Sequence, residues 1–415
     1  MASIPATFSL SGSKILRLLT LLLCFPLFPA GVSARQSGLS EDEAVFQNLS
    51  QLYREEADRT AIIDAFDKFI KMYPNSPRAP DAQFMKGEAY MAKGLELQAR
   101  TGKPVKTSPA AGAGSAAAAE LKNAVKAYRD VIGDYEQSGL EPSAQYRTGE
   151  AFYNMGDWRR AIKEFARVEK KYPKSYAVPE SLLGRACAYI ALNDFPAARA
   201  VMARLEETYP PYAQDPAAVF AKAVLELDNK NYPASRKLFS RLDTPQARFF
   251  LGKAYSCEGK TYIAAGVFEA LLKDYPATEL KEEVEFLGAD SFFYARDYDG
   301  AIVKYRDFLK NYPASKLKNA AVFRIGAALF SKREYADAQA NFQNIIDRSQ
   351  RDSFAPLAQY FIAEAYLAGK QTQNALFAYT KLTDNYPASS VSPAARYKLA
   401  WCRYLMNDYL PAARA

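Results

Sequence analysis

The 415-residue sequence contains no histidine, which removes the commonest general base and the usual partner of a catalytic serine or cysteine. The phosphate-binding signatures G-x-x-x-x-G-K-S/T and G-x-G-x-x-G are also absent. There is no C-x-x-C pair, and without histidine a zinc site is not expected. The sequence therefore predicts a protein that is not an enzyme and that has no catalytic residues, no cofactor and no metal site.

Cysteine is scarce, with four residues in the chain. Cys24 lies near the N-terminus, whereas Cys187, Cys257 and Cys402 are widely separated and odd in number. We expect these three to be small buried side chains, with no disulfide and no redox role.

The apolar run near the N-terminus, residues 18–28, is shorter than the about 20 residues of an ordinary membrane span. It follows two basic residues and precedes Val32-Ser33-Ala34, an A-x-A-like cleavage site. This pattern predicts a signal peptide over residues 1–34, a mature N-terminal segment over residues 35–42 and an exported protein. An uncleaved anchor and a lipidated Cys24 remain alternatives, although three leucines before Cys24 are a poor lipoprotein context.

No long block of charge of one sign occurs. The chain has 54 basic and 46 acidic residues, and removal of residues 1–34 leaves 52 and 46, a formal charge of +6. The two signs are interspersed, so we expect no nucleic-acid partner, and membrane association at most through a partner or an N-terminal anchor.

What fills the sequence instead is a two-helix pattern in ten copies. The clearest copy runs from Pro142 to Pro173, with small residues at positions 8 and 20, aromatic residues at positions 11 and 24, and a proline at position 32. The usual separation of 37 residues indicates a helical repeat array. The copies begin at Glu43, Pro80, Pro142, Pro179, Asp215, Pro245, Glu282, Asn319, Pro356 and Pro393.

Each marked position has a packing role. Small residues at positions 8 and 20, such as Gly149 and Ala161, let the two helices of a copy approach closely, and rings at positions 11 and 24 fill the remaining space. A Tyr-Pro pair ends the second helix in six copies. The predicted fold class is all-α: a right-handed α-solenoid of stacked antiparallel helix pairs.

Three departures from the pattern define the predicted domains. An insertion over residues 95–119, rich in Ala, Gly and Pro, predicts a flexible loop within the second copy. A short copy at Asp215 divides a first subarray, residues 43–246, from a second, residues 245–415. The last copy stops at position 23, so we expect a longer array or a covering chain at this end.

Side chains at positions 5, 9 and 12 of the first helix form the candidate site. Their spacing places them on one stripe, and in this architecture that stripe faces the concave side. Aromatic and acidic side chains suit an extended peptide or a sugar chain, although the rings could also stack between adjacent helices. The predicted binding residues are Phe84, Glu88, Tyr146, Glu150, Tyr153, Phe249, Phe286, Asp290, Phe293, Phe323, Phe330, Tyr360, Glu364 and Tyr397.

The repeats resemble the tetratricopeptide repeat superfamily. The motifs that carry the resemblance are GEAYMAKG near Gly87, GEAFYNMGDWRRAIKEF near Gly149, ARDYDGAIVKYRDFLKNYPAS from Ala295 and FAYTKLTDNYPAS from Phe377. The 37-residue variant ending in YPxS is similar to the periplasmic branch represented by BamD and YbgF (CpoB). This resemblance implies a concave partner-binding groove and a role in cell-envelope assembly.

The expected function is a periplasmic scaffold of a Gram-negative-type bacterium that binds envelope proteins or peptides, with association with the outer membrane as one option. One alternative is a scaffold for polysaccharide export or peptidoglycan handling, in which the same rings stack on a glycan. Another is the docking arm of an enzyme.

Overall fold

The computed structural model describes residues 40–55, 58–101 and 115–409. These residues form nineteen α-helices and one 3-10 turn, with no strand among them. Within this part of the chain, no helix is both long and apolar enough to cross a membrane. The predicted signal peptide, the middle of the predicted loop and the final residues 410–415 lie outside it.

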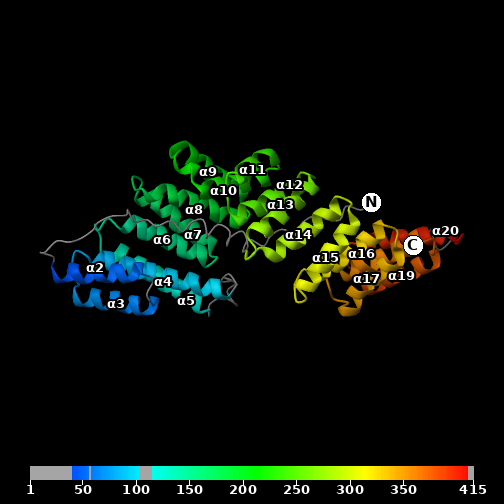
Figure 1. The fold of residues 1–415 in the computed structure, drawn as a ribbon, viewed down its shortest axis with the longest axis horizontal. Helices are drawn as coiled ribbons and strands as arrows, with labels where there is room; N and C mark the ends of the chain where they lie inside the picture. Colours follow the sequence, from blue (N-terminus) through cyan, green and yellow to red (C-terminus); the bar gives the residue numbers. More distant parts are fainter. Residues whose placement is uncertain (1–39, 56–57, 102–114, 410–415) are drawn as a thin grey trace. The chain divides into compact units, whose positions relative to one another are not determined.

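The helices follow one another in pairs along the chain (Figure 1). The first part contains α2 (Glu41–Arg54), α3 (Arg59–Met72), α4 (Ala79–Thr101), α5 (Ala116–Asp134), α6 (Glu141–Asn154), α7 (Trp158–Lys171), α8 (Ala177–Ala191), α9 (Phe195–Thr208), η1 (Tyr212–Gln214) and α10 (Pro216–Asp228). The second contains α11 (Tyr232–Phe239), α12 (Pro245–Cys257), α13 (Thr261–Asp274), α14 (Lys281–Tyr294), α15 (Tyr298–Asn311), α16 (Lys318–Ser331), α17 (Tyr335–Arg348), α18 (Ala355–Ala368), α19 (Thr372–Asn385) and α20 (Ser392–Leu405).

Two compact units make up the structure, one ending at Asn231 and one beginning at Tyr232. The division lies before α11, one helix earlier than the boundary at Pro245 predicted from the sequence. The eight-residue α11 packs on α12, where the rings of Phe239 and Phe250 stack with centroids 5.6 Å apart.

Within each unit, every helix packs on the next helix along the chain, both within a pair and between one pair and the next. The first helices also contact one another, as α4 with α6, α6 with α8, α14 with α16 and α16 with α18. The predicted all-α repeat solenoid is confirmed.

In four helix pairs the position 24 ring of the second helix lies against a glycine at position 8 of the first helix, namely Gly87, Gly149, Gly252 and Gly326. A Cβ atom on Gly149 would lie 2.6 Å from the Phe165 ring, so only glycine allows this approach. The same ring also lies under Gly184 of the next repeat, where a Cβ would be 2.7 Å away. One buried ring thus fixes both the pair and its contact with the next pair.

The position 5 ring of the first helix packs on the position 24 ring in six repeats. Centroid separations of 5.3 to 6.2 Å, with tilted or edge-on planes, are the usual geometry of aromatic pairs. The pairs are Phe84 with Tyr128, Tyr146 with Phe165, Phe249 with Phe268, Phe286 with Tyr305, Phe323 with Phe342 and Tyr360 with Tyr379.

The second helix ends at the tyrosine of the Tyr-Pro pair, as the sequence predicts. Tyr172 has φ −130° and ψ 55°, outside the helical region, as expected of a residue before proline. Its carbonyl accepts from the amide of Ser175 at 2.9 Å, and the Ser175 hydroxyl accepts from the amide of Ala177 at 3.1 Å. The serine thus closes the turn and starts the next helix.

The predicted loop over residues 95–119 differs from the structure at both ends. Helix α4 continues to Thr101, because residues 95–100 are strong helix formers, and α5 begins at Ala116 after the N-cap Ser115. Leu97 packs on the buried Ala117 and Ala118, so the extension is part of the folded array.

We expect Gly252→Ala to lower the free energy of unfolding by about 1 to 3 kcal/mol, since the added Cβ would lie 2.5 Å from the Phe268 ring. The matched control is Gly266→Ala on the partner helix α13, where no atom lies within 4 Å of the added Cβ. Alanine there should raise the free energy of unfolding by about 0.5 to 1 kcal/mol. Urea unfolding of the two variants checks the opposite signs; equal effects would contradict the close-approach role of Gly252.

Candidate functional site

Most of the predicted ring residues lie in the interior of the described structure. Their relative exposure is at most 9%, because each packs against its own or a neighbouring helix. These rings build the core, which differs from the open groove expected from their spacing. The buried rings are Phe84, Tyr146, Tyr153, Phe249, Phe286, Phe293 and Phe323.

Three predicted rings are more accessible. Phe330 and Tyr360 are half-buried, and Phe330 packs on Tyr335 and Phe361. Tyr397 on α20 is 68% exposed, the largest value among the predicted site residues.

The carboxylate of Glu88, at position 9 of α4, has two partners inside the array. The Tyr128 hydroxyl donates to its Oε1 at 2.6 Å, and Arg147 of the next repeat places Nε 3.0 Å from the same oxygen. Tyr128 is fully buried, and the side chains of Glu88 and Arg147 are each 12% exposed. This group therefore joins two repeats through a tyrosine, a carboxylate and a cation.

The same arrangement recurs at Asp290 on α14. Tyr305 donates to the Asp290 carboxylate, and Arg324 of the next repeat places Nε 2.8 Å from Oδ1. Burial raises the pKa of Asp290, and the attraction of Arg324 opposes that rise. Burial also raises the pKa of the Tyr305 hydroxyl, which stays protonated and can donate.

The third example is at Glu364 on α18. Tyr379 donates to this carboxylate, and Lys398 lies 2.9 Å from Oε1. We call each set of position 24 tyrosine, position 9 carboxylate and position 6 cation of the next repeat a joint triad.

The residue type at position 6 of a repeat depends on the residue at position 24 of the preceding repeat. It is basic in the three repeats that follow a position 24 tyrosine, and it is apolar or glycine after the other repeats. After Phe342, for example, position 9 is Ala327 and position 6 is Phe361, whose ring lies 5.5 Å from that of Phe342. Position 6 thus matches position 24 at each of these joints, whereas position 9 does not always do so, since Glu150 accompanies Phe165 and Lys253 accompanies Phe268.

Glu150 is the predicted carboxylate without a position 24 tyrosine. It is buried, and it forms an ion pair with Arg147 at 2.6 Å, so that Arg147 links it to Glu88. Burial raises the pKa of Glu150, and Arg147 opposes this effect. All four predicted carboxylates therefore have internal cationic partners.

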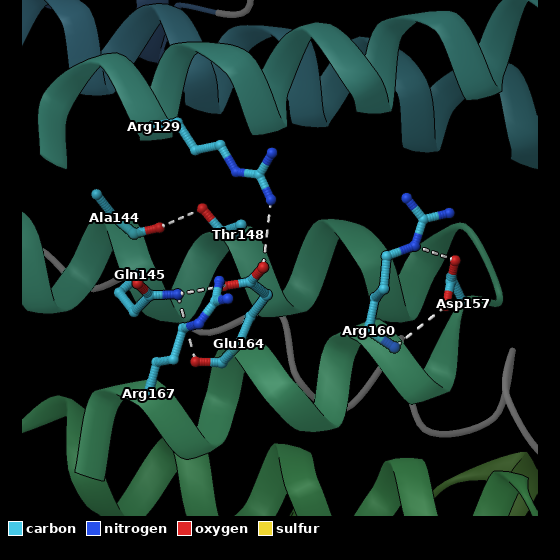
Figure 2. A network of polar contacts seen from close by, with 8 residues as sticks. All are labelled: Arg129, Ala144, Gln145, Thr148, Asp157, Arg160, Glu164 and Arg167. Carbon is cyan, nitrogen blue, oxygen red and sulfur yellow. Dashed lines mark hydrogen bonds and ion pairs between the residues drawn. The ribbon is translucent and has the colours of Figure 1, made fainter. Parts of the chain in front are cut away.

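A further buried carboxylate, Glu164 on α7, was not predicted from the sequence. Figure 2 shows that its carboxylate accepts hydrogen bonds from Arg129 of α5, Arg167 of its own helix and Gln145 of α6. The Gln145 amide donates at 2.8 Å to Oε2 and at 3.3 Å to the Glu164 carbonyl. This network also holds helices together.

The cysteines differ in part from the expectation. Cys187 and Cys402 are buried, but Cys257 is exposed at the end of α12. Burial raises the pKa of the Cys187 thiol to about 12. Among the described residues, no group of three or more His, Cys, Asp or Glu side chains could hold a metal ion.

Only on α20 do the described residues of the predicted stripe expose rings at positions 5, 9 and 12 together. Tyr397, Trp401 and Tyr404 are 68%, 42% and 53% exposed. Trp401 and Tyr404 stack, with centroids 5.6 Å apart and planes 20° apart. These three side chains, here called the α20 stripe, offer an aromatic surface with one polar edge.

Two family models, both described as tetratricopeptide repeat, match the sequence. One matches residues 44–76 and 143–175, and the other matches residues 183–249, 286–338 and 323–390. Together they cover more than half of the chain, which belongs to the tetratricopeptide repeat family. Such repeats generally mediate protein–protein interaction.

Comparison with solved structures gives the same fold. The chain is similar to the apo form of RapI, at 13% identity and a TM-score of 0.53, over 65% of this chain and 82% of RapI. It also matches the C-terminal part of a TPR repeat-containing protein from Cytophaga hutchinsonii, at 14% identity and a TM-score of 0.47, over 60% and 98% of the two chains. The similarity to RapI, at this identity, shows the fold alone. No curated protein matches the sequence.

A joint triad should tolerate complete replacement better than loss of one member. We expect Asp290→Ala to cost about 3 to 5 kcal/mol of unfolding free energy, because it leaves the Arg324 charge buried without its partner. The triple variant Asp290→Ala, Tyr305→Phe, Arg324→Phe copies the apolar set at Phe342 and should recover most of that loss. Urea unfolding measures both, and a triple variant less stable than the single one would contradict the matched-set interpretation.

Glu180 on α8 should make the free energy of unfolding of the first unit depend on pH. Burial raises its pKa from 4.5 to about 7, and one of its oxygens is buried without a hydrogen-bond partner. The folded state binds the proton of this carboxyl more tightly than the unfolded state does. The contribution of this proton to the free energy of unfolding is therefore complete below pH 4.5 and is lost as the pH rises through about 7. Thermal unfolding should show wild type and Glu180→Gln close together at low pH and the variant more stable at high pH; a pH-independent difference would contradict the shifted titration.

Proposed function

We propose that this protein is an exported, non-catalytic scaffold that binds extended protein segments in assembly of the cell envelope. The observation that carries the proposal is the repeat array, because members of this family present helical surfaces to other proteins. The apolar run and cleavage site of residues 1–34 support export to the periplasm, and the YPxS variant of the repeat supports the BamD and YbgF-like branch.

The α20 stripe is the surface that we assign to the protein partner. Large exposed rings give contact area at low entropy cost, and aromatic residues are enriched where binding energy concentrates. Lys398 and Glu364 of the last joint triad lie on α20 and α18 and supply partly exposed charges of both signs. An extended segment with apolar and polar side chains matches this combination.

A glycan is the second candidate, because the exposed Trp401–Tyr404 stack is a surface on which a sugar ring could pack. Polysaccharide export or peptidoglycan handling would then be the process served.

Capture from envelope extract tests the proposal. The full chain should recover protein partners, and Tyr397→Ala with Trp401→Ala should lower that recovery by about tenfold or more, as expected of exposed aromatic anchors. The matched control is Tyr262→Ala with Phe377→Ala, two rings that are 64% and 63% exposed on second helices.

Equal loss in the control pair would contradict the assignment to the α20 stripe. Recovery of no protein together with binding to a glycan array would replace the leading proposal by the second candidate. Alanine at Tyr146 or Phe286 is not informative for binding, because both rings are buried in the core and their loss would destabilise the fold.

A further inference from the structure

Helix α7 has an exposed surface made of one kind of residue. Six of its residues are exposed, and every one is a lysine or an arginine. At 3.6 residues per turn these six fall within an arc of about 120° on the helix. They are Arg159, Arg160, Lys163, Arg167, Lys170 and Lys171.

The acidic residues of α7 are turned away from this surface. Glu164 is buried and accepts from Arg129 and Arg167 together, as Figure 2 shows. The side chain of Glu169 is 11% exposed and contacts both Arg185 and Arg204 at 2.9 Å. Because each carboxylate is shared by two guanidinium groups, neither can neutralise the exposed cations fully.

Helix α5 extends the charged surface. Lys122, Lys126 and Arg129 are exposed at spacings of four and three residues, on one side of the helix. Arg129 reaches α7 through Glu164 at 3.2 Å, which places this stripe beside α7. Lys174, just after α7, is exposed as well. We call these four residues and the six of α7 the basic face.

Helix stability does not explain the basic face. Lys170 and Lys171 lie in the last turn of α7, where cations interact favourably with the helix dipole. In the first turn Arg160 pairs with the N-cap Asp157 and lies over the Phe152 ring, 4.8 Å from its centroid. Arg159 lies in the same turn, where the positive end of the dipole disfavours a cation. The charge therefore continues over the whole helix, including the end at which it costs stability.

We propose that the basic face docks on the surface of an anionic lipid bilayer. All exposed residues of α7 are cations, with no exposed aromatic or aliphatic side chain to stack on a nucleobase or to insert between acyl chains. The underlying helix is fixed by Phe165 and Val168, both fully buried, so the charges form a fixed array. Such an array of positive charges is complementary to the negatively charged phosphates at the surface of a bilayer.

This inference goes beyond the proposed function and does not depend on the partner of the α20 stripe. It also differs from the expectation that a membrane would be reached at most through a partner or an N-terminal anchor. The two signs alternate in the sequence, and only the fold separates them by turning Glu164 and Glu169 inward.

The test is co-sedimentation of the full chain with vesicles of phosphatidylcholine containing phosphatidylglycerol, beside vesicles of phosphatidylcholine alone. We expect binding that requires the anionic lipid and weakens as salt rises. The variant Lys122→Gln, Lys163→Gln, Lys170→Gln should lower the partition coefficient for anionic vesicles by on the order of 100-fold, since each lysine near such a surface contributes separately.

The matched control is Lys237→Gln, Lys273→Gln, Lys310→Gln, which removes the same charge from exposed positions of the second unit and should bind as wild type does. The neutral vesicles report any binding by the apolar N-terminal run, which the substitutions do not touch. The inference is overturned if the basic-face variant binds anionic vesicles like wild type, if the control loses as much, or if the chain binds a soluble polyanion but no vesicle.

Discussion

The position 24 ring is the side chain on which seven of the repeats depend, while Met202 and Leu238 take this position in two others. It lies against the glycine or other small residue of its own first helix and under the first helix of the next repeat, as Phe165 does between Gly149 and Gly184. Because the space around it is closed, its chemistry dictates that of its neighbours. A phenyl ring there is followed by an apolar residue or glycine at position 6 of the next repeat, whereas a tyrosine brings a hydroxyl that must be satisfied in the interior.

The joint triads follow from that requirement. A carboxylate at position 9 accepts from the hydroxyl, and the buried carboxylate in turn needs the cation at position 6 of the next repeat. The three polar sets at Glu88, Asp290 and Glu364, of which the last is partly exposed, therefore belong to the frame of the array. The surfaces available to partners lie elsewhere, at the α20 stripe and at the basic face.

The sequence predicted the helix pairs, their order and the role of the small and aromatic positions, because these follow from the spacing of residue types that recurs in every repeat. It did not predict the partners of the position 9 carboxylates. Asp290 meets Tyr305 and Arg324, which lie 15 and 34 residues away, and a column of acids alone resembles a solvated groove wall. The sequence feature that indicates these partners is the basic residue at position 6, which occurs in each repeat that follows a position 24 tyrosine.

The basic face could not be predicted from the sequence for a related reason. Segments such as KEFARVEKKYPK carry both signs, and only burial shows which sign reaches the solvent. Conversely, seven rings predicted to line a groove are in the core, since each of them packs against its own or a neighbouring helix.

Selection of folded variants from a library randomised together at positions 290, 305 and 324 would test the central claim most directly. If the position 24 ring dictates its neighbours, folded variants will carry either a tyrosine with a carboxylate and a cation, or an apolar ring with small or apolar partners. Free combination of the three positions among stable variants, with a phenylalanine at 305 beside an unaltered Asp290 and Arg324 as often as a tyrosine, would contradict it.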